Sequence, residues 1–131
     1  MHKTFLQTAS LLGAIAVILG AFGAHALKKL VADNAVTIFE TGVRYQFYHV
    51  FALALVGILF RDFPNKWMMW AGNFFLIGIV LFSGSLYVLT YIKAAVKPNL
   101  DWIGAITPIG GLAFIIGWVC MFIGLYKSTN N

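Results

Sequence analysis

Four long stretches without a single charged residue constrain this chain more than any other feature. They cover residues 4–24, 45–60, 67–92 and 102–126. A helix needs roughly 20 apolar residues to cross the hydrocarbon core of a bilayer, which is about 30 Å thick. Charged residues make up 10% of the sequence, against roughly 25% in soluble domains. The sequence therefore predicts an all-α, four-helix transmembrane bundle, a single integral membrane domain of residues 1–131 with spans near 4–25, 35–61, 67–92 and 101–126.

The second uncharged run is short for a span, because 16 residues at about 1.5 Å each give only about 24 Å. A helix that begins near Ala35, capped by Asp33 or Asn34, would supply the missing length. The residues ahead of the run divide between a polar and an apolar helix face. The polar face carries Thr37, Glu40, Thr41, Arg44 and Tyr48, and the apolar face carries Val36, Phe39, Val43, Phe47 and Val50. We therefore expect the second helix to start with an amphipathic turn or two at the membrane interface.

The first span imitates a secretory signal peptide, with Lys3 before an apolar stretch and an Ala24-His25-Ala26 sequence after it. The apolar stretch is about 20 residues long, however, and the apolar region of a signal peptide usually has roughly 7 to 15. We interpret this segment as a helix that is retained.

The net charge of +5 requires no nucleic acid, since lysine and arginine in short loops can meet anionic lipid head groups. We expect membrane lipid as a partner, with a larger membrane protein complex as a second candidate. The basic residues give no orientation, because the two sides carry similar numbers of them. The side of the termini has Lys3, Arg61, Lys66 and Lys127, and the opposite side has Lys28, Lys29, Arg44, Lys93 and Lys97.

Small residues recur along two of the spans. Helices in lipid associate through close packing of such residues rather than through exclusion of water. The first span has a row of Ala16, Gly20 and Ala24, preceded by Gly13, and the fourth span repeats Gly110, Gly117 and Gly124 every seven residues. We expect both rows to be lines of helix contact. Gly57, Gly72 and Gly78 form no comparable row.

Thr107-Pro108 has two interpretations. Proline removes a backbone donor, so it either kinks a longer fourth helix or begins that helix as a first-turn residue capped by Thr107. We favour the kinked longer helix, although a helix from Pro108 to Tyr126 would still nearly span the bilayer.

Polar groups gather near the membrane surface opposite the termini. Ionisable residues at membrane depth are costly and therefore point to a role. The candidate cluster consists of His25, Glu40, Arg44, Tyr45, Gln46, Tyr48 and His49. The favoured interpretation is a hydrogen-bonded network that fixes how the first two helices meet, with His25 near Tyr45 and His49. The alternatives are a haem held by the two histidines and a metal site, for which the ligand spacing matches no known type.

The sequence shows no arrangement of residues for catalysis. It has no serine with an adjacent base, no phosphate-binding glycine loop and no pair of carboxylates, and the first, third and fourth spans contain no Asp or Glu. Proton-coupled transport usually requires a carboxylate inside the bilayer. We therefore expect neither an enzyme nor a resident cofactor.

Four motifs in order along the chain resemble a known family. They are GAFGAHAL (residues 20–27), RYQFYH (44–49), LFSGSLY (81–87) and TPIGG (107–111). They resemble domain-of-unknown-function family 423, the bacterial inner-membrane proteins of the YgdD/YwdK type, which are related to transmembrane protein 256. The resemblance covers essentially the whole chain. It implies a multi-pass protein of the bacterial inner membrane and transfers no catalytic residues.

From these observations we expect a non-enzymatic accessory protein, or one that binds a lipid or small molecule. The alternative is a small transporter or channel. A transporter needs a polar path through the full bilayer, whereas the polar residues of this sequence gather toward one surface.

Overall fold

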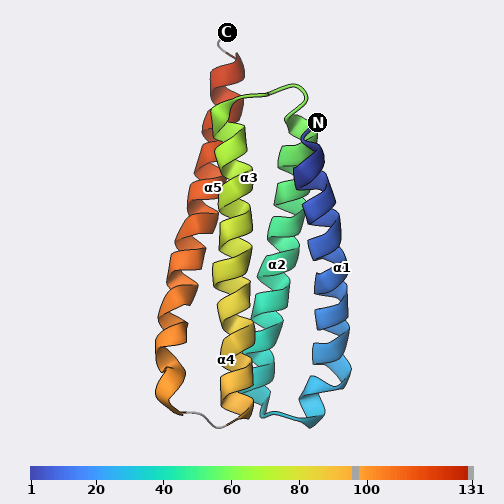
Figure 1. Cartoon of the computed structure of the whole chain (residues 1–131), viewed down its shortest axis with the longest axis vertical. Helices are drawn as coiled ribbons and strands as arrows, with labels where there is room; N and C mark the ends of the chain where they lie inside the picture. The colour runs from blue at the N-terminus through green and yellow to red at the C-terminus, as the bar shows by residue number, and fades with distance from the viewer. Residues whose placement is uncertain (96–97, 130–131) are drawn as a thin grey trace.

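The computed structural model describes the backbone of residues 1–95 and 98–129 and the side chains of residues 1–95 and 102–128. Its helices are α1 (Lys3–His25), α2 (Asp33–Leu59), α3 (Lys66–Gly78), α4 (Gly84–Ala94) and α5 (Ile106–Thr129) (Figure 1). A π-helical segment, η2 (Ile79–Ser83), joins α3 to α4 into one rod, and short 3₁₀ helices η1 (Leu27–Lys29) and η3 (Pro98–Ala105) follow α1 and precede α5.

Four helical rods are long and apolar enough to cross a membrane, and no strand occurs among the described residues. They cover Lys3–Lys29, Asp33–Leu59, Lys66–Ala94 and Trp102–Ser128. The predicted fold class is confirmed, and each predicted span agrees with its rod to within a few residues. Both termini lie at the same end of the bundle (Figure 1), as four successive crossings require.

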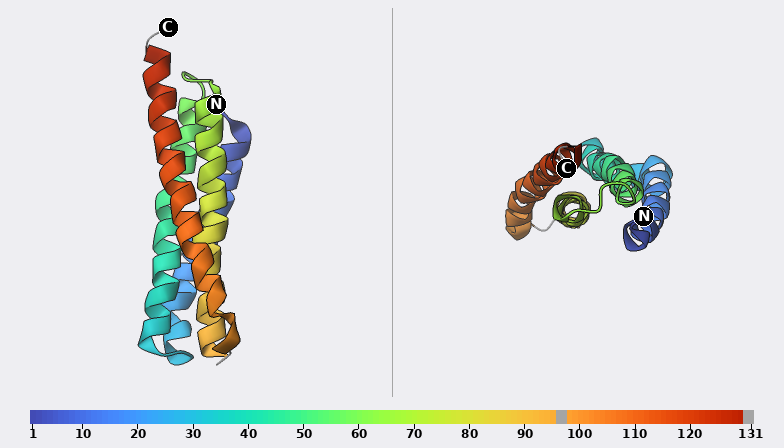
Figure 2. Two further views of the ribbon diagram at one scale, coloured as in Figure 1. Left: turned by 90° about the vertical axis from the view of Figure 1, so that its left-hand side faces the viewer. Right: turned by 90° about the horizontal axis from the view of Figure 1, so that it is seen from above.

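The rods stand in a row rather than in a closed square. α1 packs against α2, α2 packs against the α3–η2–α4 rod, and α3 and η2 pack against α5. Seen along the bundle, α1 and α5 lie at opposite ends of this row (Figure 2). The largest completely buried side chains include Leu53 and Val56 of α2 and Met68 and Phe75 of α3, the two rods in the middle of the row.

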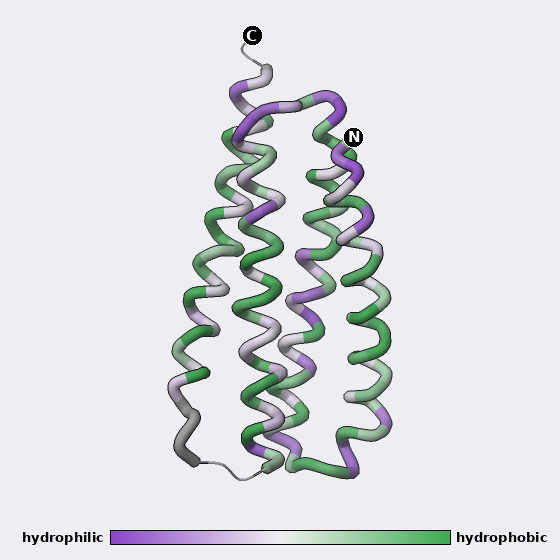
Figure 3. Tube along the Cα trace, in the orientation of Figure 1, coloured by the Kyte–Doolittle hydropathy of each residue, from purple (hydrophilic) through white to green (hydrophobic). Residues whose placement is uncertain are grey.

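Large apolar side chains also cover the outside, where lipid replaces water as the solvent. Leu11 and Ile18 of α1 and Ile115 and Phe122 of α5 are all exposed. Hydrophilic segments are concentrated in the loops and along α2 (Figure 3). α2 therefore carries polar groups into the membrane.

The two predicted faces of α2 are present. Its apolar face is buried or half-buried and its polar face is exposed or half-exposed. The predicted cap is wrong, because α2 begins at Asp33 and its N-cap is Ala32, which provides no side-chain cap. Asp33 instead lies in the first turn, where a carboxylate interacts favourably with the helix dipole.

Pro108 is the third residue of α5, which begins at Ile106. Each interpretation holds in part, because the helical rod extends from Trp102 to Ser128 as the longer helix requires, while Pro108 lies in the first turn of its α-helical part. A proline there removes a donor that has no partner within α5 anyway. Thr107 does not cap the helix. Its hydroxyl lies 2.6 Å from the hydroxyl of Ser85, which links α5 to α4.

The glycine rows face neighbouring helices. A methyl group built at Gly13 or Gly20 would lie 3.5 or 3.6 Å from a valine of α2. The row on α5 is tighter and faces the α3–η2 rod, where Gly110, Gly117 and Gly124 meet Phe82, Phe75 and Met68 respectively. The isolated glycines are contact points too, because Gly57, Gly72 and Gly78 lie directly against Leu6, Phe5 and Phe114.

Candidate functional site

A clamp between α2 and α5 is centred on His49, whose side chain is buried. The indole Nε1–H of Trp118 donates to His49 Nε2 over 3.1 Å, and His49 Nδ1 lies 2.8 Å from the carbonyl oxygen of Tyr45. Because an indole nitrogen only donates, these partners assign the imidazole proton to Nδ1. Phe114 stacks on the imidazole with ring centroids 3.5 Å apart. His49 thus holds α5 against α2 as a neutral ring with both nitrogens hydrogen-bonded.

Gln46, one turn before His49 and also buried, connects three helices. Its Nε2 donates to the carbonyl oxygen of Leu12 in α1 over 2.9 Å, and its Oε1 accepts from the hydroxyl of Tyr87 in α4 over 2.5 Å. Because the amide nitrogen of Gln46 bonds to α1 and its amide oxygen bonds to α4, this one side chain fixes the spacing of α1, α2 and α4.

The π segment η2 brings a third polar contact. Ser83 Oγ donates to the carbonyl oxygen of Gly42 over 2.6 Å, in the interior between the rod and α2. Short π segments inside α-helices are frequent at functional sites. In this chain the segment places the Phe82 ring 4.7 Å from the Tyr45 ring and 5.5 Å from the Phe114 ring, measured between centroids.

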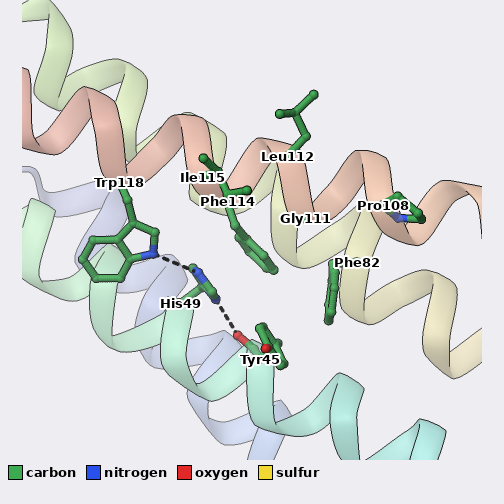
Figure 4. Close-up of a pocket in the computed structure, with 9 residues that line it drawn as sticks. All are labelled: Tyr45, His49, Phe82, Pro108, Gly111, Leu112, Phe114, Ile115 and Trp118. Carbon is green, nitrogen blue, oxygen red and sulfur yellow. Dashed lines mark hydrogen bonds between the residues drawn. The ribbon is translucent and has the colours of Figure 1, made fainter.

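A pocket of about 580 Å³ opens between α2 and α5, with η2 beside it. We call it the α2–α5 pocket. Figure 4 shows His49 hydrogen-bonded to Trp118 and to the Tyr45 backbone, with the rings of Phe114 and Phe82 on the side toward Pro108. Its lining residues are Tyr45, His49, Phe82, Pro108, Gly111, Leu112, Phe114, Ile115 and Trp118.

The depth of the α2–α5 pocket follows from α5. Pro108 lies in the first turn of α5, and Trp118 follows ten residues later, about 15 Å along the axis. His49, the partner of Trp118, lies near the middle of α2. The pocket therefore extends from near the membrane surface opposite the termini to about the centre of the bilayer.

The structure brings together only part of the predicted polar cluster. Tyr45, Gln46 and His49 are neighbours, but His25 is exposed at the end of α1, and His49 uses Trp118 of α5 as its partner instead. Gln46 makes the link between the first two helices that we assigned to the histidines. The two histidines lie at different depths in the bundle. α2 starts at Asp33, so His49 lies more than four turns along it, whereas His25 lies at the end of α1.

The remaining predicted residues of the cluster, Glu40, Arg44 and Tyr48, are exposed on the outer face of α2. Sequence reasoning missed Trp118, Phe114, Phe82 and Tyr87. One signal was available, because Trp118 lies in the middle of an uncharged run, away from the interfaces where tryptophan normally collects. An indole N–H at that depth requires an acceptor, and His49 is the only imidazole within the four uncharged runs of the sequence.

Hydrogen bonding in the interior is complete for the described part of the chain, where no buried side-chain nitrogen or oxygen lacks a partner. In the same part, no three His, Cys, Asp or Glu side chains converge as a metal site would require. The buried polar groups thus stabilise helix contacts, at roughly 0.6 kcal/mol for each hydrogen bond inside a membrane.

The geometry around His49 predicts that the purified protein does not bind haem through this residue. An axial ligand needs a free imidazole nitrogen, and both nitrogens of His49 have partners within 3.1 Å. We expect no Soret band at stoichiometric intensity in the absorption spectrum of protein purified in mild detergent. A stoichiometric Soret band that disappears in His49→Ala would contradict this prediction.

Comparisons with known proteins agree on one family. Residues 19–111 match the family model described as "Protein of unknown function (DUF423)". The chain is 38% identical to a UPF0382 membrane protein of Staphylococcus aureus, over 98% of this chain and 99% of that protein. It is 40% identical to a UPF0382 membrane protein of Haemophilus influenzae, over 99% of each chain. It is 36% identical to the UPF0382 inner membrane protein YgdD of Escherichia coli, over 98% of this chain and 94% of YgdD. No solved structure matches.

Proposed function

The chain belongs to the DUF423 family of membrane proteins, and we propose that it is a non-enzymatic accessory protein of the bacterial inner membrane that binds an apolar lipid or small molecule. The proposal rests on one observation above all, the α2–α5 pocket, whose walls are mostly aromatic and aliphatic side chains. Its volume of about 580 Å³ lies within the range of roughly 300 to 1,000 Å³ that is typical of small-molecule sites.

The chemistry of the walls selects the ligand class. Both nitrogens of the His49 imidazole are hydrogen-bonded, one to Trp118 and one to the Tyr45 carbonyl oxygen. The ring therefore has no donor or acceptor left for a polar ligand. Phe82 and Phe114 provide ring surfaces, and Pro108, Gly111 and Ile115 provide aliphatic surface. An acyl chain, an isoprenoid chain or a flat apolar molecule can pack against such walls without losing hydrogen bonds to water.

Binding is favoured over transport because the polar groups of α2 do not continue across the bilayer. Beyond His49, α2 runs through Val50 to Leu59 without a polar side chain. A transporter or channel would need polar groups along that half of the membrane as well. The α2–α5 pocket instead ends at the clamp between His49 and Trp118.

Gly111→Leu should fill the α2–α5 pocket without disturbing the backbone. A methyl group at Gly111 would lie 3.8 Å from the Phe82 ring, which is ordinary contact. A leucine side chain that displaces about two methylene groups of a ligand should weaken binding about tenfold, at about 0.8 kcal/mol for each methylene. The measurement is native mass spectrometry of co-purifying lipids and small molecules after extraction in mild detergent.

Gly84→Leu is the matched control, because nothing lies within 4 Å of a methyl group at Gly84, which is not among the residues that line the pocket. The control should retain its bound molecules. Equal retention by wild type and both variants, or equal loss from both variants, would contradict the proposal. Discovery of a bound polar metabolite at this position would contradict the assigned ligand class.

A further inference from the structure

A second pocket, of about 380 Å³, lies at the other membrane surface, the side of the termini. It forms where α3 begins and α5 ends, so a segment from the middle of the sequence and one near its C-terminal end enclose it. We call it the α3–α5 pocket. Its lining residues are Pro64, Asn65, Lys66, Trp67, Lys127 and Ser128.

Two ammonium groups converge on this pocket. The Nζ atom of Lys66 lies 5.7 Å from the centroid of the Trp67 ring, and the Nζ atom of Lys127 lies 5.1 Å from the same centroid. The two charges are thus within about 11 Å of each other, and no residue that lines the pocket is acidic. Two like charges at this separation repel each other weakly in water, and an anion between them would attract both.

The start of α3 adds to this positive field. The side-chain oxygen of Asn65 accepts from the amides of Trp67 and Met68, each over 3.1 Å, and its carbonyl oxygen accepts from Met69 over 3.2 Å. Asn65 thereby satisfies three of the first four amides of the helix and leaves that of Lys66. A lysine as first residue is unfavourable against the positive end of the helix dipole, whereas an anion at that position is stabilised.

An apolar groove continues from this position into the membrane. The rings of Trp67 and Trp70 are in edge contact, with centroids 5.8 Å apart. Trp70 begins a groove of about 250 Å³ that runs along α3 over Asn73 and Phe74 to Ile77, about 10 Å of helix. A ligand with an anionic head and an apolar chain fits both features together.

We propose that the α3–α5 pocket binds the phosphate of an anionic phospholipid, with Lys66 and Lys127 on the phosphate and one acyl chain in the groove below Trp70. This site is separate from the α2–α5 pocket and lies at the opposite surface, so it stands or fails independently of the proposed function. The adjoining groove favours a membrane lipid over a soluble phosphate.

The test uses the full chain in nanodiscs that contain equal amounts of phosphatidylglycerol and phosphatidylcholine with identical acyl chains. Native mass spectrometry measures the ratio of the two lipids retained on the protein. The double variant Lys66→Gln, Lys127→Gln should lose the preference for phosphatidylglycerol by about fivefold for each lysine. Both lysines are exposed, so the fold does not depend on them.

Lys28→Gln, Lys29→Gln is the matched control, because it removes two adjacent positive charges at the opposite membrane surface. It should retain the preference of the wild type, and so should Lys66→Arg, Lys127→Arg. The same loss in the Lys28, Lys29 control would overturn the proposal, as would an unchanged preference in the Lys66→Gln, Lys127→Gln variant. Displacement of short-chain phosphatidylglycerol by an equal concentration of inorganic phosphate would also overturn it, since a soluble anion would then suffice.

Discussion

Gly110→Ala should loosen the membrane bundle strongly, by about 2 to 3 kcal/mol, although it adds a single methyl group. The added carbon would lie 2.7 Å from the Phe82 Cα atom and 2.8 Å from the Leu81 carbonyl carbon. These are backbone atoms, which cannot rotate away as a side chain can. α5 would have to move off η2, and the contacts of the neighbouring α5 residues with the rod would weaken with it. The measurement is the thermal midpoint of unfolding in mild detergent.

Gly84→Ala makes the same chemical change on the facing α3–η2–α4 rod and is the control. Nothing lies within 4 Å of the added methyl group, and the backbone at Gly84 is already helical, with φ −59°. The thermal midpoint should remain or rise slightly, since glycine inside a helix is less favourable than alanine by roughly 0.5 to 1 kcal/mol. Equal shifts in the two variants would show that the contact between α5 and η2 does not hold the bundle together.

The two glycine variants illustrate what the sequence can predict about packing. Gly110, Gly117 and Gly124 recur every seven residues, so the sequence predicts that they share one side of a helix. It does not predict which helix approaches that side, because any apolar span offers similar side chains. An isolated glycine such as Gly78 belongs to no repeat, so its spacing predicts no contact. Its partner Phe114 lies on another helix and far away in the sequence.

The four membrane spans are predictable from the sequence because placing a charged side chain in lipid costs much free energy. The ends of each uncharged run therefore lie close to the ends of a span. The π segment was not predictable from its residues. Ile79–Ser83 contains neither proline nor glycine, and the close backbone contact of Phe82 with Gly110 exists only in the assembled bundle.

The predicted polar cluster shows that the position of charged residues can give the wrong membrane depth for the side chains that follow them. Arg44 ends the charged segment of α2, and the uncharged run after it predicts that the membrane begins there. Arginine has a long side chain that can extend toward the interface while its backbone lies deeper. The membrane-embedded part of α2 can therefore begin before Arg44, which places Gln46 and His49 near mid-helix and away from His25.

His49→Ala should destabilise the protein by about 3 kcal/mol, because it removes both the hydrogen bond and the ring stack that join α2 to α5. The variant leaves a cavity beside Phe114 and an unpaired indole N–H on Trp118 at mid-membrane depth. Trp118→Phe removes the donor alone and keeps most of the aromatic surface, so its effect should be nearer 1 kcal/mol. The free energy of unfolding in detergent is measured for both variants and for the double variant.

The double variant separates the hydrogen bond from the packing around it. The combined loss should fall short of the sum of the single losses by roughly 0.6 kcal/mol or more, the size of a hydrogen bond between membrane helices. Tyr48→Ala, an aromatic truncation one residue earlier on the exposed face of α2, should have little effect on stability. If Tyr48→Ala and His49→Ala lower the unfolding free energy equally, or if the two clamp variants add without coupling, His49 and Trp118 do not join α2 to α5. The α2–α5 pocket would then lack its inner end, because that end is formed by these two side chains.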